Sequence, residues 1–256
     1  MAFVPDSRAY VPGTAADGAV IDAGLRGYML RVYNWMASGL LLTGAVAYGV
    51  ANTSLINLFY QVVQTPRGTA VQPTLLGYAA MFAPLVFVMV LSFGVNRLSR
   101  PATQALFWAF AAAMGASLAN IFLVYAGGSI ARVFFVTAGT FGAMSIYGYT
   151  TKTDLTRFGS FLIMGLIGVV IASLVNMFIG SSGLQFAISV IGVLVFVGLT
   201  AYDTQRIKGD YVQYAYAQGT DGAAVRSVYD ALSLYLNFIN LFMLMLQLFG
   251  VRNSSN

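Results

Sequence analysis

The sequence predicts an all-α polytopic membrane protein that crosses the bilayer with seven transmembrane helices. Of its 256 residues, 59% are hydrophobic and only 8% are charged, whereas a soluble domain carries about 25% charged residues. Apolar runs recur along the chain at close to the length of about 20 residues that a helix needs to cross a bilayer. The 27 glycines and 15 tyrosines also suit helices that pack together in a membrane.

Each predicted span is an apolar run bounded by turn or charge signals. The seven spans cover residues 29–51, 74–95, 103–125, 129–149, 159–179, 184–205 and 229–250. The breaks hold, in order, Pro66-Arg67-Gly68, Asn96-Arg97 with Arg100-Pro101, Gly127-Gly128, Lys152-Thr153-Asp154, Ser181-Ser182-Gly183 and Lys208-Gly209-Asp210. Such residues are typical of turns and membrane interfaces. The short breaks near 127 and 182 predict tight helical hairpins, whereas residues 52–73 and 206–228 are predicted to be long loops.

The spans divide the chain into three parts. Residues 1–24 are predicted to be a flexible cytoplasmic tail, because prolines and aspartates are scattered there without a helical period. This tail also has no basic segment followed by an apolar run, so we expect no cleaved signal peptide. Residues 25–252 form the predicted seven-helix membrane domain, and residues 253–256 form a short C-terminal tail.

The basic residues predict the orientation of the chain. With seven spans and a cytoplasmic N-terminus, ten of the 13 lysines and arginines fall on the cytoplasmic side: Arg8, Arg26, Arg31, Arg97, Arg100, Lys152, Arg157, Arg206, Lys208 and Arg226. Only Arg67, Arg132 and Arg252 fall on the opposite side. An excess of basic residues marks the cytoplasmic side of a membrane protein. A six-span arrangement with a re-entrant last segment remains an alternative, because Gln247 and other polar residues weaken the seventh span.

The composition excludes several kinds of chemistry. The chain has no cysteine and no histidine, and all eight of its acidic residues are aspartate. Thiolate and histidine metal sites, cysteine nucleophiles and Ser-His catalysis are therefore excluded. A pair of aspartates as in an intramembrane protease is disfavoured, since Asp230 lacks the flanking glycines of that motif. We therefore expect no enzyme and no cofactor. The net charge of +5 sets topology here and predicts no nucleic-acid partner.

Two aspartates lie inside or at the edge of a predicted span. Asp203 lies near the cytoplasmic end of the sixth span, and Asp230 begins the seventh. An ionised aspartate near the centre of a membrane helix costs roughly 2.5–3.5 kcal/mol, and less near an end. Side chains kept at this cost usually face a partner, water or a transport pathway. Asp203 is either an interfacial anchor paired with Arg206 or Arg97, or part of such a pathway.

The seventh span carries a polar stripe. Asp230, Ser233, Asn237, Asn240 and Gln247 fall within about 100° of the helix circumference at 100° per residue. A polar stripe on a membrane helix is expected to face inward, because unsatisfied amides in hydrocarbon are costly. The stripe either holds helices together by hydrogen bonds or lines a route for water or ions beside Asp203.

Small residues recur at the spacing of helix-packing motifs. Gly142 with Ala138, and Gly115 with Ala119, lie one helical turn apart. Such pairs let two membrane helices approach closely. We therefore expect close helix packing at both places.

Several longer motifs resemble one known family. The runs Ala201-Tyr202-Asp203-Thr204-Gln205-Arg206-Ile207 and Ala231-Leu232-Ser233-Leu234-Tyr235-Leu236-Asn237-Phe238-Ile239-Asn240-Leu241-Phe242 resemble the signature of the Bax inhibitor-1 (transmembrane Bax inhibitor motif) family. Gly142-Ala143-Met144-Ser145, Tyr149-Thr150-Thr151-Lys152-Thr153-Asp154-Leu155 and Asn120-Ile121-Phe122-Leu123-Val124-Tyr125 are similar to it as well. The resemblance covers about residues 25–252 and fits the bacterial branch best. It implies a multi-pass protein of the cell inner membrane, with six helices around a central seventh.

The resemblance also implies a function, a pH-sensitive calcium leak. In that mechanism two aspartates on the last two helices share a proton, and a nearby arginine latches the closed state. The first aspartate corresponds to Asp203, but the second position is Asn237, which cannot ionise. Arg97 at the end of the second span is the expected latch. Asp230, two turns before Asn237 on the same face, is the expected source of the missing charge.

Two functions follow as alternatives. The first is a calcium leak whose ion passes Asp203, Asn237, Asp230 and Asn240, with Asp203 as the candidate metal contact, because carboxylate and amide oxygens suit hard cations. The second is a regulator without transport of its own, which binds other membrane proteins such as a membrane protease. The lipid bilayer is the expected partner in both.

Overall fold

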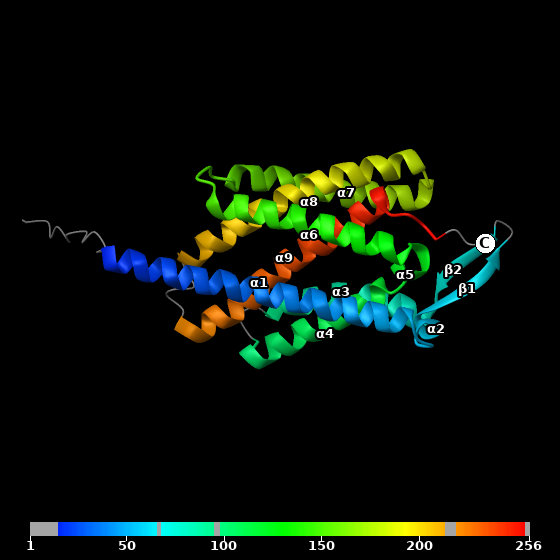
Figure 1. Ribbon diagram of the computed structural model, residues 1–256, viewed down its shortest axis with the longest axis horizontal. Helices are drawn as coiled ribbons and strands as arrows, with labels where there is room; N and C mark the ends of the chain where they lie inside the picture. Colours follow the sequence, from blue (N-terminus) through cyan, green and yellow to red (C-terminus); the bar gives the residue numbers. More distant parts are fainter. Residues whose placement is uncertain (1–14, 66–67, 95–97, 213–218, 254–256) are drawn as a thin grey trace, which may run out of the picture.

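The structure, a computed structural model, describes residues 15–65, 68–94, 98–212 and 219–253. The helices in these ranges are α1 (Ala15–Ala51), α2 (Ile56–Phe59), α3 (Leu75–Gly94), α4 (Arg100–Leu118), α5 (Ile121–Val124), α6 (Gly127–Thr150), α7 (Thr156–Ile179), α8 (Ser182–Asp210) and α9 (Gly219–Phe249). The two strands are β1 (Tyr60–Thr65) and β2 (Gly68–Pro73). The long helices form one elongated bundle (Figure 1), so the predicted all-α membrane fold is confirmed.

Six helices within the described ranges are long and apolar enough to cross a membrane. They are Leu75–Gly94, Arg100–Val124 (α4 with α5), Gly127–Thr150, Thr156–Ile179, Ser182–Asp210 and Gly222–Phe249. They match six of the seven predicted spans. The remaining prediction, residues 29–51, corresponds to α1, which lies outside this set but packs along α4 and α9 in the same bundle. α1 already begins at Ala15, upstream of the predicted boundary between tail and membrane domain at residue 25.

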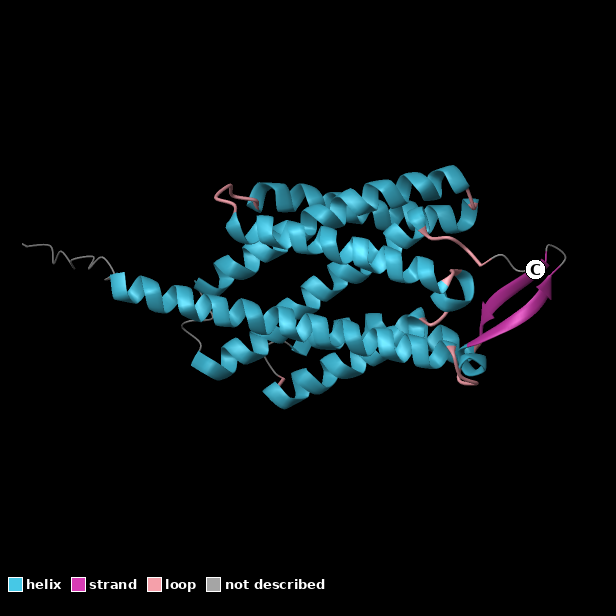
Figure 2. Cartoon of the chain, in the orientation of Figure 1, coloured by secondary structure: helices cyan, strands magenta, loops and turns pink. Residues whose placement is uncertain are grey.

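The first predicted loop contains regular structure. Residues 52–73 hold α2 and an antiparallel hairpin in which Tyr60 pairs with Pro73 and Gln61 with Gln72. Figure 2 shows the two strands projecting beyond one end of the helices. The β-branched valines and threonines on either side of the predicted turn favour the extended conformation. The second predicted loop, 206–228, is shorter than expected, because α8 continues to Asp210 and α9 begins at Gly219.

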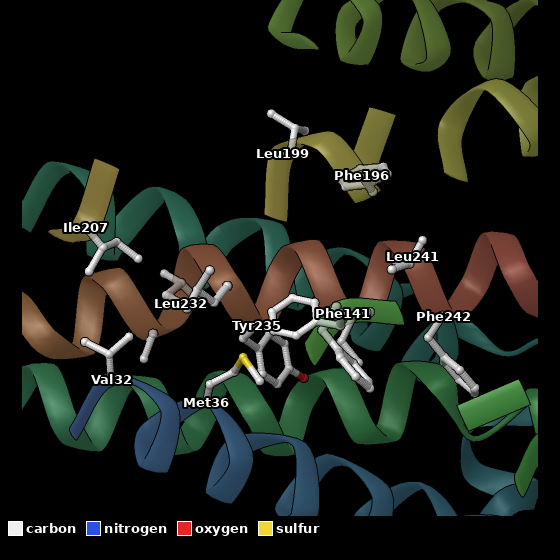
Figure 3. Close-up of a cluster of buried hydrophobic side chains, with 14 of the residues drawn as sticks. Val32, Met36, Phe141, Phe196, Leu199, Ile207, Leu232, Tyr235, Leu241 and Phe242 are labelled. Carbon is white, nitrogen blue, oxygen red and sulfur yellow. The ribbon is translucent and has the colours of Figure 1, made fainter. Parts of the chain in front are cut away.

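The last helix occupies the centre of the bundle, as predicted. α9 packs against α1, α4, α6 and α8, whereas α3 and α7 pack farther out, on α4 and α8. Leu234, Tyr235, Leu241 and Leu246 of α9 are fully buried. Figure 3 shows the apolar side chains that α1, α6 and α8 direct at this helix. Four helices rather than six therefore surround α9.

One polar contact fixes the middle of the bundle. The Tyr235 hydroxyl of α9 lies 2.7 Å from Thr43 Oγ1 of α1, and Thr43 Oγ1 donates to the Ala111 carbonyl of α4 at 2.8 Å. The Phe110 ring packs edge-on against Tyr235 with 5.1 Å between ring centroids. This contact satisfies a phenol and a hydroxyl that are buried in the membrane domain, and it holds three helices in register.

α9 crosses the whole bundle as one continuous helix. The segment after it is fixed at the end that carries the hairpin, where Ala126 N donates to Val251 O at 3.0 Å and Asn253 N donates to Val124 O at 2.9 Å. The start of α1 lies at the opposite end (Figure 1). The re-entrant last segment that the sequence left open is therefore not what the structure has.

The close approach of α6 to α8 predicts a stability effect. A Cβ added to Gly148 of α6 would lie closer to the Ala201 carbonyl oxygen of α8 than Cβ atoms come to other atoms in real structures. Because this oxygen belongs to the backbone of a helix, it cannot move aside as the end of a flexible side chain could. We expect Gly148→Ala to destabilise the protein by about 1–3 kcal/mol. The matched control is Gly139→Ala on the same helix, where a Cβ meets nothing within 4 Å. Thermal unfolding of both purified variants measures the difference, and equal stability would contradict this account of the α6–α8 contact.

The opposite ends of α1 and α9 predict the result of reporter fusions. We expect a reporter that is active only outside the cytoplasm to be active when fused after Asn256, and silent when inserted in the loop after Asp210. The physical reason is the excess of basic residues at the end that carries the α6–α7 and α8–α9 loops. Activity from the loop fusion, or silence from the C-terminal fusion, would show that this orientation is wrong.

Candidate functional site

Asp203 connects the last two long helices. It lies on α8 with 15% of its side chain exposed. Asn237 Nδ2 of α9 donates to Asp203 Oδ2 at 2.7 Å. Arg206 of α8 holds the other oxygen, with Nε 3.0 Å and Nη2 2.9 Å from Asp203 Oδ1. The expected pairing of Asp203 with Arg206 is therefore present, together with a direct link to Asn237.

The ion pairs continue from Arg206 to Asp230. Arg206 Nη1 lies 3.7 Å from Asp210 Oδ2, and Arg226 Nη2 of α9 lies 2.6 Å from the same oxygen. Arg226 Nε lies 3.4 Å from Asp230 Oδ1. The two arginines alternate with three aspartates along α8 and α9, so the set carries one more negative than positive charge.

α1 completes the network. The Tyr28 hydroxyl donates to Asp230 Oδ2 at 2.6 Å, and only 3% of the Asp230 side chain is exposed. A buried carboxylate needs such partners, because an unpaired charge in a low-dielectric interior is costly. We call Tyr28, Asp203, Arg206, Asp210, Arg226 and Asp230 the charged cluster. It binds α1, α8 and α9 together at the end of the bundle where α1 begins.

Two of the family-like motifs meet beside this cluster. Gln205, two residues after Asp203, accepts a hydrogen bond from Leu155 N at 2.8 Å and donates to Thr153 O at 2.8 Å. The motif around Asp203 therefore fixes the loop between α6 and α7. These hydrogen bonds hold α8 against the α6–α7 loop.

The other predicted site residues lie apart from the cluster. Asn240 is exposed, and its Nδ2 donates to Leu236 O of its own helix at 2.8 Å. It therefore differs from the inward orientation expected of the polar stripe. Gln247 is also exposed; it accepts hydrogen bonds from Gln185 at 2.7 Å and Ser189 at 3.0 Å at the opposite end of α8. Arg97 lies outside the described residues, so its role as a latch stays a prediction.

Sequence reasoning missed Asp210 and Arg226 as members of the cluster. Asp210 was placed in a loop, whereas α8 reaches it and sets it one turn from Arg206. A signal was available, since Arg206 with Asp210 and Arg226 with Asp230 are both spaced four residues apart, the spacing of ion pairs on a helix.

The cluster suits interactions with cations and protons, but it holds its carboxylates in ion pairs. Within the described ranges, no group of three or more acidic, histidine or cysteine side chains gathers in a way that would hold a metal ion. Both oxygens of Asp203, the candidate metal contact, are engaged by Arg206 and Asn237. A cation reaching Asp203 would therefore have to displace one of these partners.

Comparison with known proteins assigns the chain to a family. The family model described as inhibitor of apoptosis-promoting Bax1 matches residues 25–254. A protein of Caulobacter vibrioides is 47% identical over 95% of this chain and 97% of its own length. The protein RP147 of Rickettsia prowazekii is 45% identical over 93% of this chain and 95% of its own. The inner membrane protein YbhL of Escherichia coli is 47% identical over 90% of this chain and 94% of its own. The chain therefore belongs to the Bax inhibitor-1 family of membrane proteins.

Proposed function

We propose that this protein is a pH-sensitive cation leak of the cell inner membrane, with calcium as the transported ion, and not an enzyme. The observation that carries the proposal is the hydrogen bond of 2.7 Å between Asn237 and Asp203, which joins α9 to α8 at a carboxylate. The inner-membrane location rests on the relative YbhL, whose name gives that location.

The protonation state of Asp203 sets the strength of this joint. An ionised Asp203 attracts the Arg206 guanidinium and accepts a charge-assisted hydrogen bond from Asn237, and such bonds are roughly twice as strong as neutral ones. A protonated Asp203 keeps only a neutral hydrogen bond and loses the attraction to Arg206. Acidification therefore loosens the contact between α8 and α9. In this proposal, the weaker contact between α8 and α9 opens the route for ions beside Asp203.

The rest of the charged cluster supplies the attraction for a cation. Three carboxylates stand against two guanidinium groups, and oxygen ligands of this kind suit calcium. When the route opens, an arginine that moves away from its aspartate would leave a carboxylate oxygen available to a passing ion. Among the residues that the structure describes, Arg206 of α8 contacts Asp203, so in this proposal Arg206 acts as a latch beside the predicted Arg97.

The first test of the proposal is calcium flux into liposomes that contain the purified protein. We expect flux that rises as pH falls, because protonation of Asp203 weakens its contacts with Arg206 and Asn237. Absence of flux at every pH would overturn the proposal and leave the alternative, a regulator that binds other membrane proteins without transport.

Asp203→Asn should remove most of the pH dependence of this flux. Asparagine keeps the size of the side chain but holds it permanently neutral, so the joint is weak at every pH. The matched control is Asp154→Asn in the exposed loop before α7. The hydroxyl and backbone N–H of Thr156 hold the pKa of the Asp154 carboxyl below its usual range, so we expect Asp154→Asn to keep the pH response of the wild type. A full pH response in Asp203→Asn would remove Asp203 from the sensing role.

Asn237→Asp should move the midpoint of the pH response upward and strengthen calcium binding. Two carboxylates within hydrogen-bond distance cannot both ionise easily, so the pair keeps a proton to higher pH and titrates in two coupled steps. The matched control is Asn240→Asp, which adds the same charge one turn away, where the native amide contacts only its own helix. An unchanged midpoint in Asn237→Asp, or an equal shift in Asn240→Asp, would show that the 2.7 Å contact is not the sensor.

A further inference from the structure

A long apolar groove separates α1 from α6. A cavity of about 660 Å³ is lined by both helices and by Phe238 of α9. It shares Tyr33, Gly142 and Ser145 with a second cavity of about 440 Å³, and Gly44 and Phe134 with a third of about 350 Å³. The shared residues make these cavities one continuous hollow, which we call the α1–α6 groove. Figure 1 shows the two helices running side by side along it.

Small residues on the walls of the groove leave its space unfilled. A Cβ added to Gly44 of α1 or Gly142 of α6 would meet no atom within 4 Å. Gly142 and Ala138 were expected to bring two helices together, but both line the groove instead. Gly115 does meet a neighbouring helix, since a Cβ there would be 2.6 Å from the Thr43 carbonyl oxygen. The α6 pair therefore keeps a space open within the apolar part of the bundle.

The mouth of the groove at the charged-cluster end is basic. Arg26 of α1 lines it, together with Tyr149 of α6. Lys208 of α8 donates to Tyr149 O at 3.0 Å and lies 5.0 Å from the centroid of the Tyr149 ring. Arg26 thus lies in the lining at one end of a hollow with apolar walls, and Lys208 lies against the Tyr149 that shares this lining. This distribution of charge is complementary to an anionic amphiphile.

One wall residue near this mouth is polar. Ser145 lines the groove, but its Oγ is buried within the protein and has no hydrogen-bond partner among the residues that the structure describes. The hydroxyl is therefore not exposed to a ligand in the groove, and the wall there is apolar in effect.

We propose that the α1–α6 groove binds a membrane phospholipid with an anionic headgroup. Its phosphate lies at Arg26, with Lys208 near the same mouth, and one acyl chain runs along α1 toward Gly44 over Phe238. Along α1, the lining residues extend from Arg26 to Tyr48, which is close to the hydrocarbon core of roughly 30 Å at about 1.5 Å per residue. Since that core holds two leaflets, one lipid with its phosphate at Arg26 occupies the half of the groove nearest this mouth. The proposal does not depend on the ion leak.

The site adjoins the charged cluster. Tyr33 lines the groove, and its hydroxyl lies 3.4 Å from Thr204 Oγ1. Thr204 is the residue next to Asp203. A lipid seated in the groove would therefore contact a side chain that packs on α8 beside Asp203.

The test is native mass spectrometry of the full-length protein in detergent, titrated with phosphatidylglycerol and, separately, with phosphatidylcholine. We expect one tightly retained phosphatidylglycerol and weaker retention of the zwitterionic lipid. Arg26→Gln should weaken retention of phosphatidylglycerol about fivefold, whereas Arg157→Gln, an exposed arginine on α7, should leave it unchanged. Equal retention of the two lipids by the wild type would overturn the headgroup assignment.

Gly142→Leu tests the position of the acyl chain. A Cβ at this position meets no atom within 4 Å and the residue lines the groove, so the leucine would occupy space taken by the acyl chain, and we expect roughly tenfold weaker lipid retention or more. Gly139→Leu is the matched control, because it adds the same side chain to the same helix in open space outside the groove. Thermal unfolding confirms folding, and Gly44→Leu replaces Gly142→Leu if that variant fails to fold. Equal retention in the Gly142 and Gly139 variants, or co-purification of a protein in place of lipid, would overturn the site.

Discussion

Hydrocarbon offers no hydrogen-bond partner, so the polar side chains of a helix inside a membrane must find partners on other helices. α9 carries several such side chains, and its neighbours supply partners for them. Tyr235 finds Thr43 on α1, and Asn237 finds Asp203 on α8. The central place of α9 follows, because only a helix with neighbours on several sides can satisfy polar groups that point in several directions.

The charged cluster supplies partners for the carboxylates of α8 and α9. Asp230 is almost fully buried and takes partners from both α1 and its own helix, whereas Asp203 keeps partial contact with solvent. Removal of one partner from a buried pair leaves an uncompensated charge, which is strongly destabilising. The more exposed carboxylate is therefore the one able to change protonation without disrupting the bundle, and Asp230 serves better as a fixed anchor. This division favours Asp203 over Asp230 as the sensing group.

The sequence predicted the features that depend on one helix at a time. Apolar runs of bilayer length located α3, α4 and α6 to α9, and the polar stripe indicated that α9 lies inside. Features that depend on a neighbour were harder to predict. Asn240 belongs to the same stripe as Asn237, yet only Asn237 meets a partner helix, because four helices rather than six surround α9. Gly142 and Gly115 have the same local pattern, and only the three-dimensional arrangement shows that one meets a helix and the other an open groove.

α1 is the element on which the two proposed sites meet. Tyr28 of α1 binds Asp230 in the charged cluster, and Tyr33, about one and a half turns later, lines the groove and reaches Thr204. A shift of α1 that changed one contact would change the other, since both side chains stand on one rigid helix. Linkage then imposes a condition. If a lipid in the groove binds one state of the α8–α9 contact more tightly and protonation of Asp203 shifts that contact, protonation must alter the affinity for lipid, and lipid must alter the affinity of Asp203 for a proton by the same factor. The pH dependence of lipid retention would therefore report on the joint without any measurement of ion flux, and Asp203→Asn should abolish that dependence while leaving the groove intact.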